Sequence, residues 1–274
     1  MIKKILILFK IARKIAQSDI INIFSRFHEI PKIIKFFLYI LSFSFSNSNK
    51  LYDKNINEEE KLCNSIQEMG TTFIKLGQFL STRPDIIGNE IAQKLENLQD
   101  KLPPFPTDQA KKIIKKELGE NSYNLLLSIS EPVAAASIAQ VHKAKLNDNG
   151  TTKDIAIKIL RPNIKKKFNE EIDALMLLAF LIEGTIKKSK RLKLVEVVFL
   201  LKEITNLELD LRFEASAANE FLENTKNDVG FIVPKIFWSF TSENILTLEW
   251  IDGISIREKE KLDNLNIDTK TLAT

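Results

Sequence analysis

The sequence predicts an α+β fold in which a small antiparallel sheet is combined with long helices. Segments near 138–146 and 153–160 are short and apolar, and they flank Asn147-Asp148-Asn149-Gly150, a typical hairpin turn. Segments at about 163–187 and 192–223 have the longer apolar spacing of helices. The chain has 274 residues, of which 44% are hydrophobic, and this composition is sufficient for an ordinary globular core.

Further elements are predicted on both sides of these segments. Residues 57–118 have the pattern of three or four helices, with Thr107 as the expected N-cap of the last and breaks at Gly70, Arg83-Pro84 and Pro103-Pro104-Phe105-Pro106. Two more strands are expected near 235–241 and 244–250. The charged tail from Arg257 to Asp268 is expected to begin a helix or to form a frayed end.

Lys158 lies in the second strand of the predicted hairpin. Strand alternation places it on the face opposite three isoleucines, Ile155, Ile157 and Ile159. A lysine on a half-buried strand needs an anion or a carboxylate beside it to keep its charge, and the small Ala156 leaves room for a flat ring. The position suits a lysine that pairs with phosphates below an adenine. The alternative is an edge lysine that extends into water.

An alanine-rich turn precedes the hairpin and consists of Ala134, Ala135, Ala136 and Ser137. Glycine-rich loops cover nucleotide phosphates because glycine lets backbone amides approach closely. The sequence has no GxGxxG, and alanine methyl groups in this place are expected to stiffen the loop. Consecutive alanines also occur in any buried turn or helix, so the prediction depends on the neighbouring segments.

The segment Lys75-Leu76-Gly77-Gln78 is predicted to be helical. Lys75 and Gln78 are three residues apart and therefore share a face. Gly77 costs such a helix about 1 kcal/mol relative to alanine, which implies that another backbone or a ligand approaches closely. An ordinary amphipathic helix with a surface lysine and glutamine is the alternative.

The acidic residues Glu208, Asp210 and Glu214 lie in a segment whose local pattern fits either a strand or a helix. We predict a helix throughout, with several of its surfaces covered by other parts of the protein. Carboxylates that face inward need cations, and Lys158 and Lys75 are the expected partners. The alternative is a solvated face with pairs such as Glu208 and Arg212, worth a few tenths of a kcal/mol.

In this order the segments resemble the UbiB/ADCK family of atypical protein-kinase-like proteins. The KxGQ motif is Lys75-Leu76-Gly77-Gln78, the alanine-rich loop runs from Ala134 to Ser137, the strand lysine is Lys158 and the ExD motif is Glu208-Leu209-Asp210. The segment Ser81-Thr82-Arg83-Pro84-Asp85, Arg161-Pro162, and Glu214-Ala215 with Asn219 agree as well, whereas Ala139 replaces a glycine that is usual in relatives. The resemblance covers about residues 50–255.

The resemblance implies a kinase-like small lobe that binds ATP or ADP. Lys158 would pair with the α and β phosphates and with a helix carboxylate, expected to be Glu208, and the alanine-rich loop would lie over the phosphates. Hinge residues Glu249 and Ile251 would contact the nucleotide. Lys75, Gly77 and Gln78 would reach across the cleft into the place of a peptide substrate, which suits ATP hydrolysis or small-molecule chemistry. The catalytic residues implied are Lys158, Glu208, Asp210 and Glu214.

Groups that complete phosphoryl transfer in kinases follow the hinge, namely a catalytic-loop aspartate and asparagine and the DFG aspartate. Up to Thr274 the sequence contains no Asp-Phe-Gly, and neither of its two histidines, His28 and His142, begins a catalytic-loop pattern. We therefore expect that most of the large lobe is missing, that Mg²⁺ is used by complete family members, and that this chain has no metal site. The sole cysteine, Cys63, excludes an internal disulfide and, for want of ligands, zinc chemistry.

Residues 1–50 carry nine lysines and arginines against two acidic residues, a balance of +7. Helical spacing from Ile2 to Gln17 separates basic from apolar residues, so this segment can lie on an anionic bilayer or dock on the protein body. The charge-free stretch Phe36–Asn49 is shorter than the roughly 20 residues that span a bilayer. Nucleic-acid binding is a poor fit, because the basic face lacks stacking aromatics.

Four parts follow from these observations: a basic membrane-facing arm (1–50), a helical KxGQ extension (51–130), a kinase-like small lobe (131–255) and the start of a truncated large lobe (256–274). We expect an intracellular protein, peripheral on the cytoplasmic face of the inner membrane, that supports ubiquinone biosynthesis together with other biosynthesis proteins or lipid intermediates. Two alternatives are a catalytically inactive scaffold for ubiquinone-synthesis proteins and an unrelated helical interaction protein with a fortuitous lysine.

Overall fold

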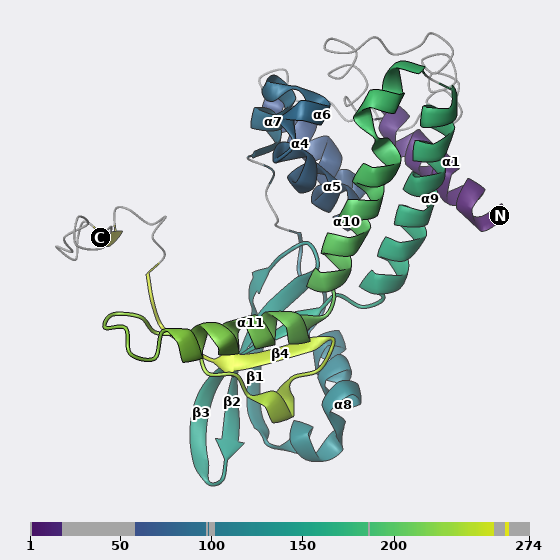
Figure 1. The fold of residues 1–274 in the computed structure, drawn as a ribbon. Helices are drawn as coiled ribbons and strands as arrows, with labels where there is room; N and C mark the ends of the chain where they lie inside the picture. The colour runs from purple at the N-terminus through teal and green to yellow at the C-terminus, as the bar shows by residue number, and fades with distance from the viewer. Residues whose placement is uncertain are drawn as a thin grey trace.

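The computed structural model describes residues 2–17, 58–96, 98, 102–185, 187–254 and 261–262. Most helices form one group, and a four-stranded sheet with two further helices forms another (Figure 1). The two groups are joined through the lower ends of two long helices, α9 (Ile164–Thr185) and α10 (Leu194–Glu208). This α+β architecture confirms the predicted fold class.

The helical group is built around α9 and α10, which pack side by side. Against them lie α1 (Ile2–Gln17) and α5 (Thr71–Ser81), and α5 in turn contacts α4 (Glu58–Met69), α6 (Pro84–Ile87) and α7 (Asn89–Glu96). The 3-10 helix η1 (Lys187–Leu192) leads into α10. Apolar side chains from different helices meet in a common core that includes Leu62, Ile74, Phe168, Ile172 and Leu201. The KxGQ segment is helical as predicted and forms the middle of α5.

The sheet is antiparallel with the strand order β1-β2-β3-β4. Its strands are β1 (Leu126–Ala135), β2 (Ala139–Asp148), β3 (Thr151–Leu160) and β4 (Ile245–Glu249). The turn between β2 and β3 places Asn149 and Gly150 at φ values of 53° and 86°, the left-handed region that a tight hairpin turn needs. The predicted hairpin is confirmed.

The two faces of β3 contact different parts of the protein. Ile155, Ile157 and Ile159 are fully buried in a second core, which includes Ala110 and Ile114 of α8 (Thr107–Asn124). Leu160 on the opposite face belongs to the core of the helical group. Lys158 lies on that same opposite face, so the strand alternation is confirmed and the lysine points toward the junction of the two groups.

Several predicted elements were wrong in detail. The expected N-cap Thr107 is the first residue of α8, where Pro106 precedes it as N-cap and the Thr107 hydroxyl donates to Glu131. The strand expected near 235–241 is a single bridge between Ile236 and Leu248 followed by the 3-10 turn Trp238–Phe240. Strand β1 was not predicted, because its proline and the register shifts of an edge strand obscure the alternation.

The helix predicted over 192–223 is two helices. It breaks at Leu209 and Asp210, and α11 (Leu211–Asn224) begins after them. Asp210 has an extended backbone (φ −121°, ψ 99°), and its side chain accepts a hydrogen bond from the Arg212 amide, so it caps the new helix. The alternation of apolar and acidic residues made the secondary structure of this segment ambiguous, and it coincides with the break between the two helices.

Some sequence predictions fall outside the described residues. These are the stretch Phe36–Asn49, the rest of the arm after Gln17, and the tail except for residues 261–262. Within the described part of the chain, none of the helices combines the length and the apolar composition that crossing a bilayer requires.

Gly77 is buried where α5 meets the segment after α7. A Cβ at this position would lie 2.6 Å from Cδ2 of Leu98. The close approach predicted from the sequence is made by the side chain of Leu98, where a backbone or a ligand had been expected.

We predict that Gly77→Ala lowers the free energy of unfolding by about 1 kcal/mol, because overpacking outweighs the better helix propensity of alanine. In a Leu98→Ala background the clash is removed, and the same substitution is expected to raise stability relative to that background. Urea denaturation of the wild type, the two single variants and the double variant gives the free energies of unfolding that test this prediction. An equal effect of Gly77→Ala in both backgrounds would contradict the packing explanation.

Candidate functional site

Two lysines from distant parts of the sequence form ion pairs with two neighbouring carboxylates. Lys158 of β3 binds Glu214 of α11, with its Nζ 2.8 Å from Oε1 and 2.7 Å from Oε2. Lys75 of α5 binds Glu208 at the end of α10 with an Nζ–Oε2 distance of 2.6 Å. The lysine side chains are 27% and 14% exposed, so both pairs are partly shielded from water. Along the chain the two carboxylates are six residues apart, on either side of the break at Leu209 and Asp210.

The expected pairing of Lys158 with Glu208 is wrong. The chain turns at Leu209 and Asp210, and α11 then crosses the sheet beside β4 (Figure 1). Glu214 in the first turn of α11 faces β3, whereas Glu208 remains on α10 beside α5. A continuous helix could not present the two carboxylates in these two directions.

Asp210 has a structural role at the break. Its Oδ1 accepts from the Arg212 amide at 3.1 Å and from Nε at 2.9 Å, and its Oδ2 accepts from Nη2 at 2.7 Å. Hydrogen bonds from the Arg212 side chain hold the pKa of the Asp210 carboxyl below its usual value, with smaller contributions from the Arg212 amide and the nearby positive charges. Lys165 forms a further ion pair with Glu243, whose carbonyl accepts from the Leu211 amide at 3.0 Å.

The alanine-rich segment begins inside β1 and turns into β2. Ala134 and Ala135 are strand residues paired with Val141 and Gln140, and Ser137 is buried in the turn. The Ala136 amide donates to the Ala139 carbonyl at 2.8 Å, which closes the turn. The expected loop is thus a short, hydrogen-bonded connection at the end of the sheet that is nearest the helical group.

The predicted hinge residues lie at the end of β4. The Glu249 amide donates to the Lys235 carbonyl at 2.8 Å, and the Trp250 amide donates to the Asp154 carbonyl at 3.2 Å. The Lys143 ammonium lies 4.6 Å from the centroid of the Trp250 ring. Ile251 follows with its side chain partly exposed.

The KxGQ residues do not all reach the site. Lys75 contacts Glu208, Gly77 packs against Leu98, and the Gln78 carbonyl accepts a hydrogen bond from the Ser81 hydroxyl at 2.7 Å. Thus Lys75 is the motif residue that the structure brings to the ExD carboxylate.

Sequence reasoning missed a buried polar pair in β2. Gln140 and His142 are fully buried, and the Gln140 amide group bonds both the amide (2.9 Å) and the carbonyl (3.2 Å) of Phe105. His142 lies 2.9 Å from Gln140 through Nε2 and 2.8 Å from the Ser130 carbonyl through Nδ1. Their two-residue spacing on a strand, in step with Ala144 and Leu146, was the available signal for inward-facing polar groups. This pair fastens the segment before α8 to the sheet.

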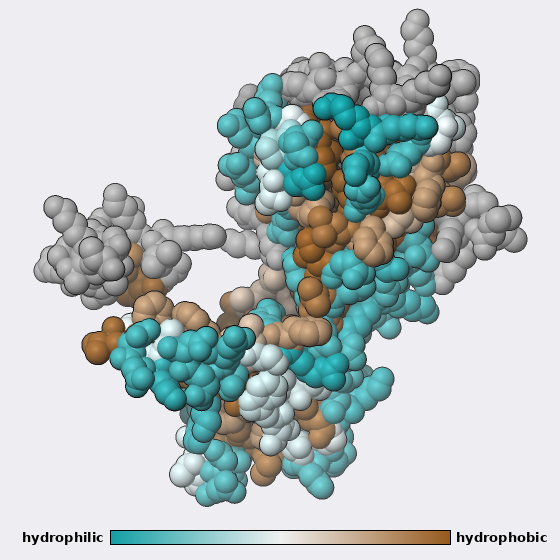
Figure 2. Space-filling model, in the orientation of Figure 1, coloured by the Kyte–Doolittle hydropathy of each residue, from teal (hydrophilic) through white to brown (hydrophobic). Residues whose placement is uncertain are grey.

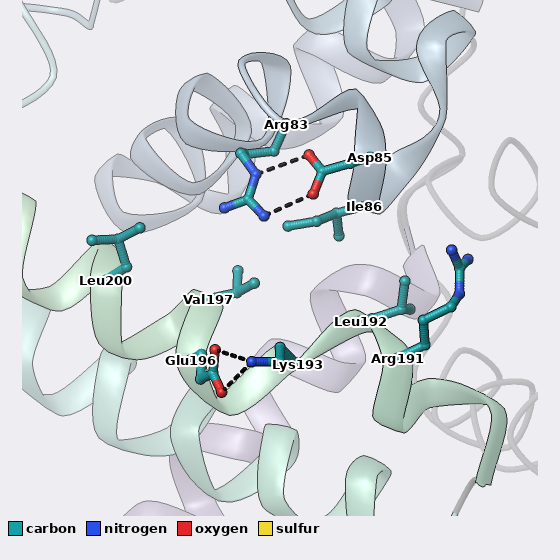
Figure 3. Close-up of a pocket in the computed structure, with 9 residues that line it drawn as sticks. All are labelled: Arg83, Asp85, Ile86, Arg191, Leu192, Lys193, Glu196, Val197 and Leu200. Carbon is teal, nitrogen blue, oxygen red and sulfur yellow. Dashed lines mark hydrogen bonds and ion pairs between the residues drawn. The ribbon is translucent and has the colours of Figure 1, made fainter.

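A cavity of about 230 Å³ lies elsewhere, between α6 and the start of α10 (Figure 3). Its wall carries the Arg83–Asp85 and Lys193–Glu196 ion pairs together with apolar side chains. Glu196 and Glu208 are twelve residues apart on α10, which corresponds to roughly 18 Å along the helix. The cavity is therefore separate from the paired lysines.

Within the described part of the chain, no group of three or more histidine, cysteine or acidic side chains is arranged to hold a metal ion. Glu208, Asp210 and Glu214 each face a cation of the protein.

The sheet, the paired strand lysine and the following helix define the small lobe of a kinase-like fold. In agreement, the family model of the ABC1 atypical kinase-like domain matches residues 97–274. A probable protein kinase UbiB of Marinobacter nauticus is 35% identical over 89% of this chain and 44% of its own length. Proteins of the same name are 37% identical over 76% of this chain, with 39% of the Pseudomonas aeruginosa protein and 38% of the Xanthomonas campestris protein covered.

The chain belongs to the ABC1 atypical kinase-like family, and the resemblance to UbiB/ADCK proteins is confirmed. It spans less than half the length of these UbiB relatives.

The lowered pKa of Asp210 predicts a pH dependence of stability. A carboxyl whose pKa is depressed in the folded state stabilises the protein above its unfolded pKa of about 3.8, and this contribution is lost as the pH falls through the folded value. Asp210→Asn retains an N-cap oxygen but not the charge. We expect the variant to be less stable than the wild type at pH 7, with the difference in free energy of unfolding shrinking toward pH 3. A difference that stays constant or grows on acidification would contradict this assignment.

Proposed function

We propose that this chain binds ATP or ADP at the junction of the sheet and the helical group, as part of a UbiB-type atypical kinase or ATPase. The observation that carries the proposal is the pair of ion pairs at this junction, Lys158–Glu214 and Lys75–Glu208. Glu214 holds the Lys158 ammonium on the face of β3 that also carries the small, buried Ala156. In the proposed complex the adenine lies beside Ala156, and the phosphates reach the Lys158 ammonium.

The charges of the site bear on how a triphosphate is held. The ion pairs around the break contain four cations, Lys75, Lys158, Lys165 and Arg212, and four carboxylates, Glu208, Asp210, Glu214 and Glu243. These charges balance, so a triphosphate needs further positive charge or aligned amides. In complete family members Mg²⁺ would supply that charge, and we assign no residue of this chain to the metal.

Support of ubiquinone biosynthesis is part of the proposal. It rests on the family resemblance and on the name of the relatives, which are called probable protein kinase UbiB. Ubiquinone-biosynthesis proteins or lipid intermediates are the proposed partners, and the cytoplasmic face of the inner membrane is the proposed location. The contact between Lys75 and Glu208 supports ATP hydrolysis or small-molecule chemistry, because the family resemblance implies that the KxGQ helix stands where a peptide substrate would bind.

Membrane contact is proposed for the exposed face of α1. The other face packs on the helical group: Ile11 is buried there, and the Lys14 ammonium donates to the Met69 carbonyl at 3.2 Å. Leu6 and Phe9 are 58% and 51% exposed, and the basic Lys10 and Arg13 are exposed as well. A helix docked in this way can place two apolar side chains and two cations on an anionic lipid surface.

A catalytically inactive scaffold is the second candidate. The observation that favours it is the balance of charges, because each of these four cations already has a carboxylate partner. In that case the ion pairs would stabilise the protein on either side of the helix break, with Lys165–Glu243 linking α9 to the segment before β4, and would bind no nucleotide.

For the nucleotide proposal, we expect ATP at about 100 times its Kd to raise the Tm of the chain by roughly 5 °C. Lys158→Ala is expected to abolish the increase. Lys153→Ala is the matched control, because Lys153 lies in the same strand and pairs with Asp148 at the hairpin end. Thermal unfolding of the wild type and of the two variants, with and without ATP and Mg²⁺, gives the Tm shifts. No shift in the wild type, or equal shifts in both variants, would favour the scaffold.

For the membrane proposal, we expect Phe9→Ser to weaken binding of the full chain to vesicles that contain anionic phospholipid by about tenfold, from the lost apolar burial. Phe231→Ser is the control, because Phe231 is 62% exposed, no less than Phe9, but lies beyond α11. Co-sedimentation with vesicles gives the affinities. If both variants bind the vesicles as tightly as the wild type, α1 does not contact the membrane.

A further inference from the structure

The cavity between α6 and the start of α10 carries more positive than negative charge. Its wall contains three cations, Arg83, Arg191 and Lys193, and two carboxylates, Asp85 and Glu196. Both carboxylates are paired within the wall, at 2.8 Å in Arg83–Asp85 and at 2.9 Å in Lys193–Glu196. Among the residues that the structure describes, Arg191 has no carboxylate partner, and it stands exposed at one side of the cavity (Figure 3). One positive charge is therefore left for an anion.

The rest of the cavity wall is apolar. Ile86 and Val197 are buried, Leu192 is half-buried and Leu200 is 41% exposed. Apolar side chains combined with a few placed charges are typical of small-molecule sites. The volume of about 230 Å³ equals that of roughly eight water molecules, which is room for a head group and a short apolar segment.

The apolar wall continues along α10 beyond the cavity. Val197, Leu200, Ile204 and Glu208 follow one another at spacings of three and four residues and share one face of the helix. Ile204 is 39% exposed, and Leu207 on the same side is 56% exposed. In the space-filling view, apolar surface is exposed on the helical group between polar patches (Figure 2). This face of α10 leads from the cavity to the ExD carboxylate.

Lys193 has an uncommon backbone conformation in the cavity wall. It is the N-cap of α10, with φ 48° and ψ 50° in the left-handed region that residues with a side chain rarely adopt. Its amide donates to the Lys190 carbonyl at 3.3 Å, and its carbonyl accepts from the Val197 amide at 3.0 Å. Backbone outliers of this kind cluster at functional sites. Here the outlier turns η1 into α10, so that Arg191 and Lys193 stand at the same opening.

We propose that this cavity binds the head group of a single anionic amphiphile, such as an alkyl phosphate or a fatty acid, whose apolar chain lies along Leu200, Ile204 and Leu207. Arg191 pairs with the head group. The excess positive charge selects an anion, and the apolar face selects a ligand with a chain over free phosphate. The inference gives a site to the proposed lipid partners and rests on that part of the proposed function, whereas it is independent of nucleotide binding.

A single molecule fits these features better than the surface of a bilayer. Leu200 and Ile204 are about two-fifths exposed and lie beside a hollow that contains the charges. On α1, by contrast, Leu6 and Phe9 are 58% and 51% exposed and project from the helix. Projecting side chains can enter a bilayer, whereas a hollow takes up a separate head group.

The test uses octyl phosphate as the probe, with inorganic phosphate as the head group alone and octanol as the chain alone. Calorimetry measures their affinities for the full chain below the concentration at which micelles form. Arg191→Gln removes the unpaired cation, and Lys190→Gln is the matched control, because it removes a charge of the same 3-10 helix outside the cavity wall. Leu200→Ser changes the apolar wall. Phe199→Ser is its control, because Phe199 is 57% exposed on α10 and does not line the cavity.

We expect one octyl phosphate to bind per chain, and inorganic phosphate and octanol to bind about tenfold more weakly, because each makes only part of the contacts. Arg191→Gln should weaken octyl phosphate about tenfold through loss of a charge-assisted contact. Leu200→Ser should weaken it about fivefold through lost apolar burial, with inorganic phosphate unchanged. The two control variants should bind as the wild type does.

Absence of octyl phosphate binding, or equal losses in a wall variant and its control, would overturn the inference. Inorganic phosphate or octanol bound as tightly as octyl phosphate would also overturn it, because the site would then recognise only a head group or only a chain. If Leu200→Ser weakens binding to anionic vesicles while octyl phosphate does not bind, this face contacts a bilayer and the inference is wrong.

The ATP-dependent rise in Tm, measured on the same wild-type protein, separates this inference from the nucleotide proposal. A rise that requires Lys158, without octyl phosphate binding, overturns the inference alone. Binding of octyl phosphate without any rise in Tm overturns the nucleotide proposal and leaves the inference supported.

Discussion

The site depends on the helix break at Leu209 and Asp210. If α10 continued into α11 as one helix, its carboxylates would all project from a single helix axis. Only one of the two lysines could then form a well-placed ion pair. The extended backbone of Asp210, stabilised by its cap on α11, turns the chain across the sheet. Glu208 therefore stays with the helical group and Lys75, and Glu214 goes to the sheet and Lys158. Asp210, the aspartate of the ExD motif, thus directs Glu208 and Glu214 to different lysines.

Around this junction, the paired charges are held by two cores. The isoleucine face of β3 packs against α8, while the opposite face of the strand turns toward the helical group. Lys158 emerges on the second face, where burial of an unpaired ammonium would be costly and Glu214 provides the compensating charge. Arg161 and Thr71 extend the same connection with neutral carbonyl acceptors. The hydrogen bond from the Thr71 hydroxyl to the Ser137 carbonyl thus joins the KxGQ helix to the sheet, whereas each of the two lysine ion pairs lies within one group.

Much of this arrangement could be predicted where the signal was local. Period-two alternation placed the isoleucines and Lys158 on opposite faces of β3, and the turn residues defined the hairpin. The order of the motifs identified the family. Pairing of the carboxylates could not be predicted, because Glu208 and Glu214 look equivalent until the break between them is known. The hydrogen bonds from Arg161 to the Ala136 carbonyl and from Thr71 to the Ser137 carbonyl join residues 25 and 66 positions apart, for which the sequence carries no local signal.

The most direct test of the account is a crystal structure of the chain with a non-hydrolysable ATP analogue. The account predicts that the adenine lies beside Ala156, with the α and β phosphates next to the Lys158 ammonium. Nucleotide bound instead in the cavity between α6 and α10, or Lys158 and Glu214 paired as before with the phosphates elsewhere, would contradict it.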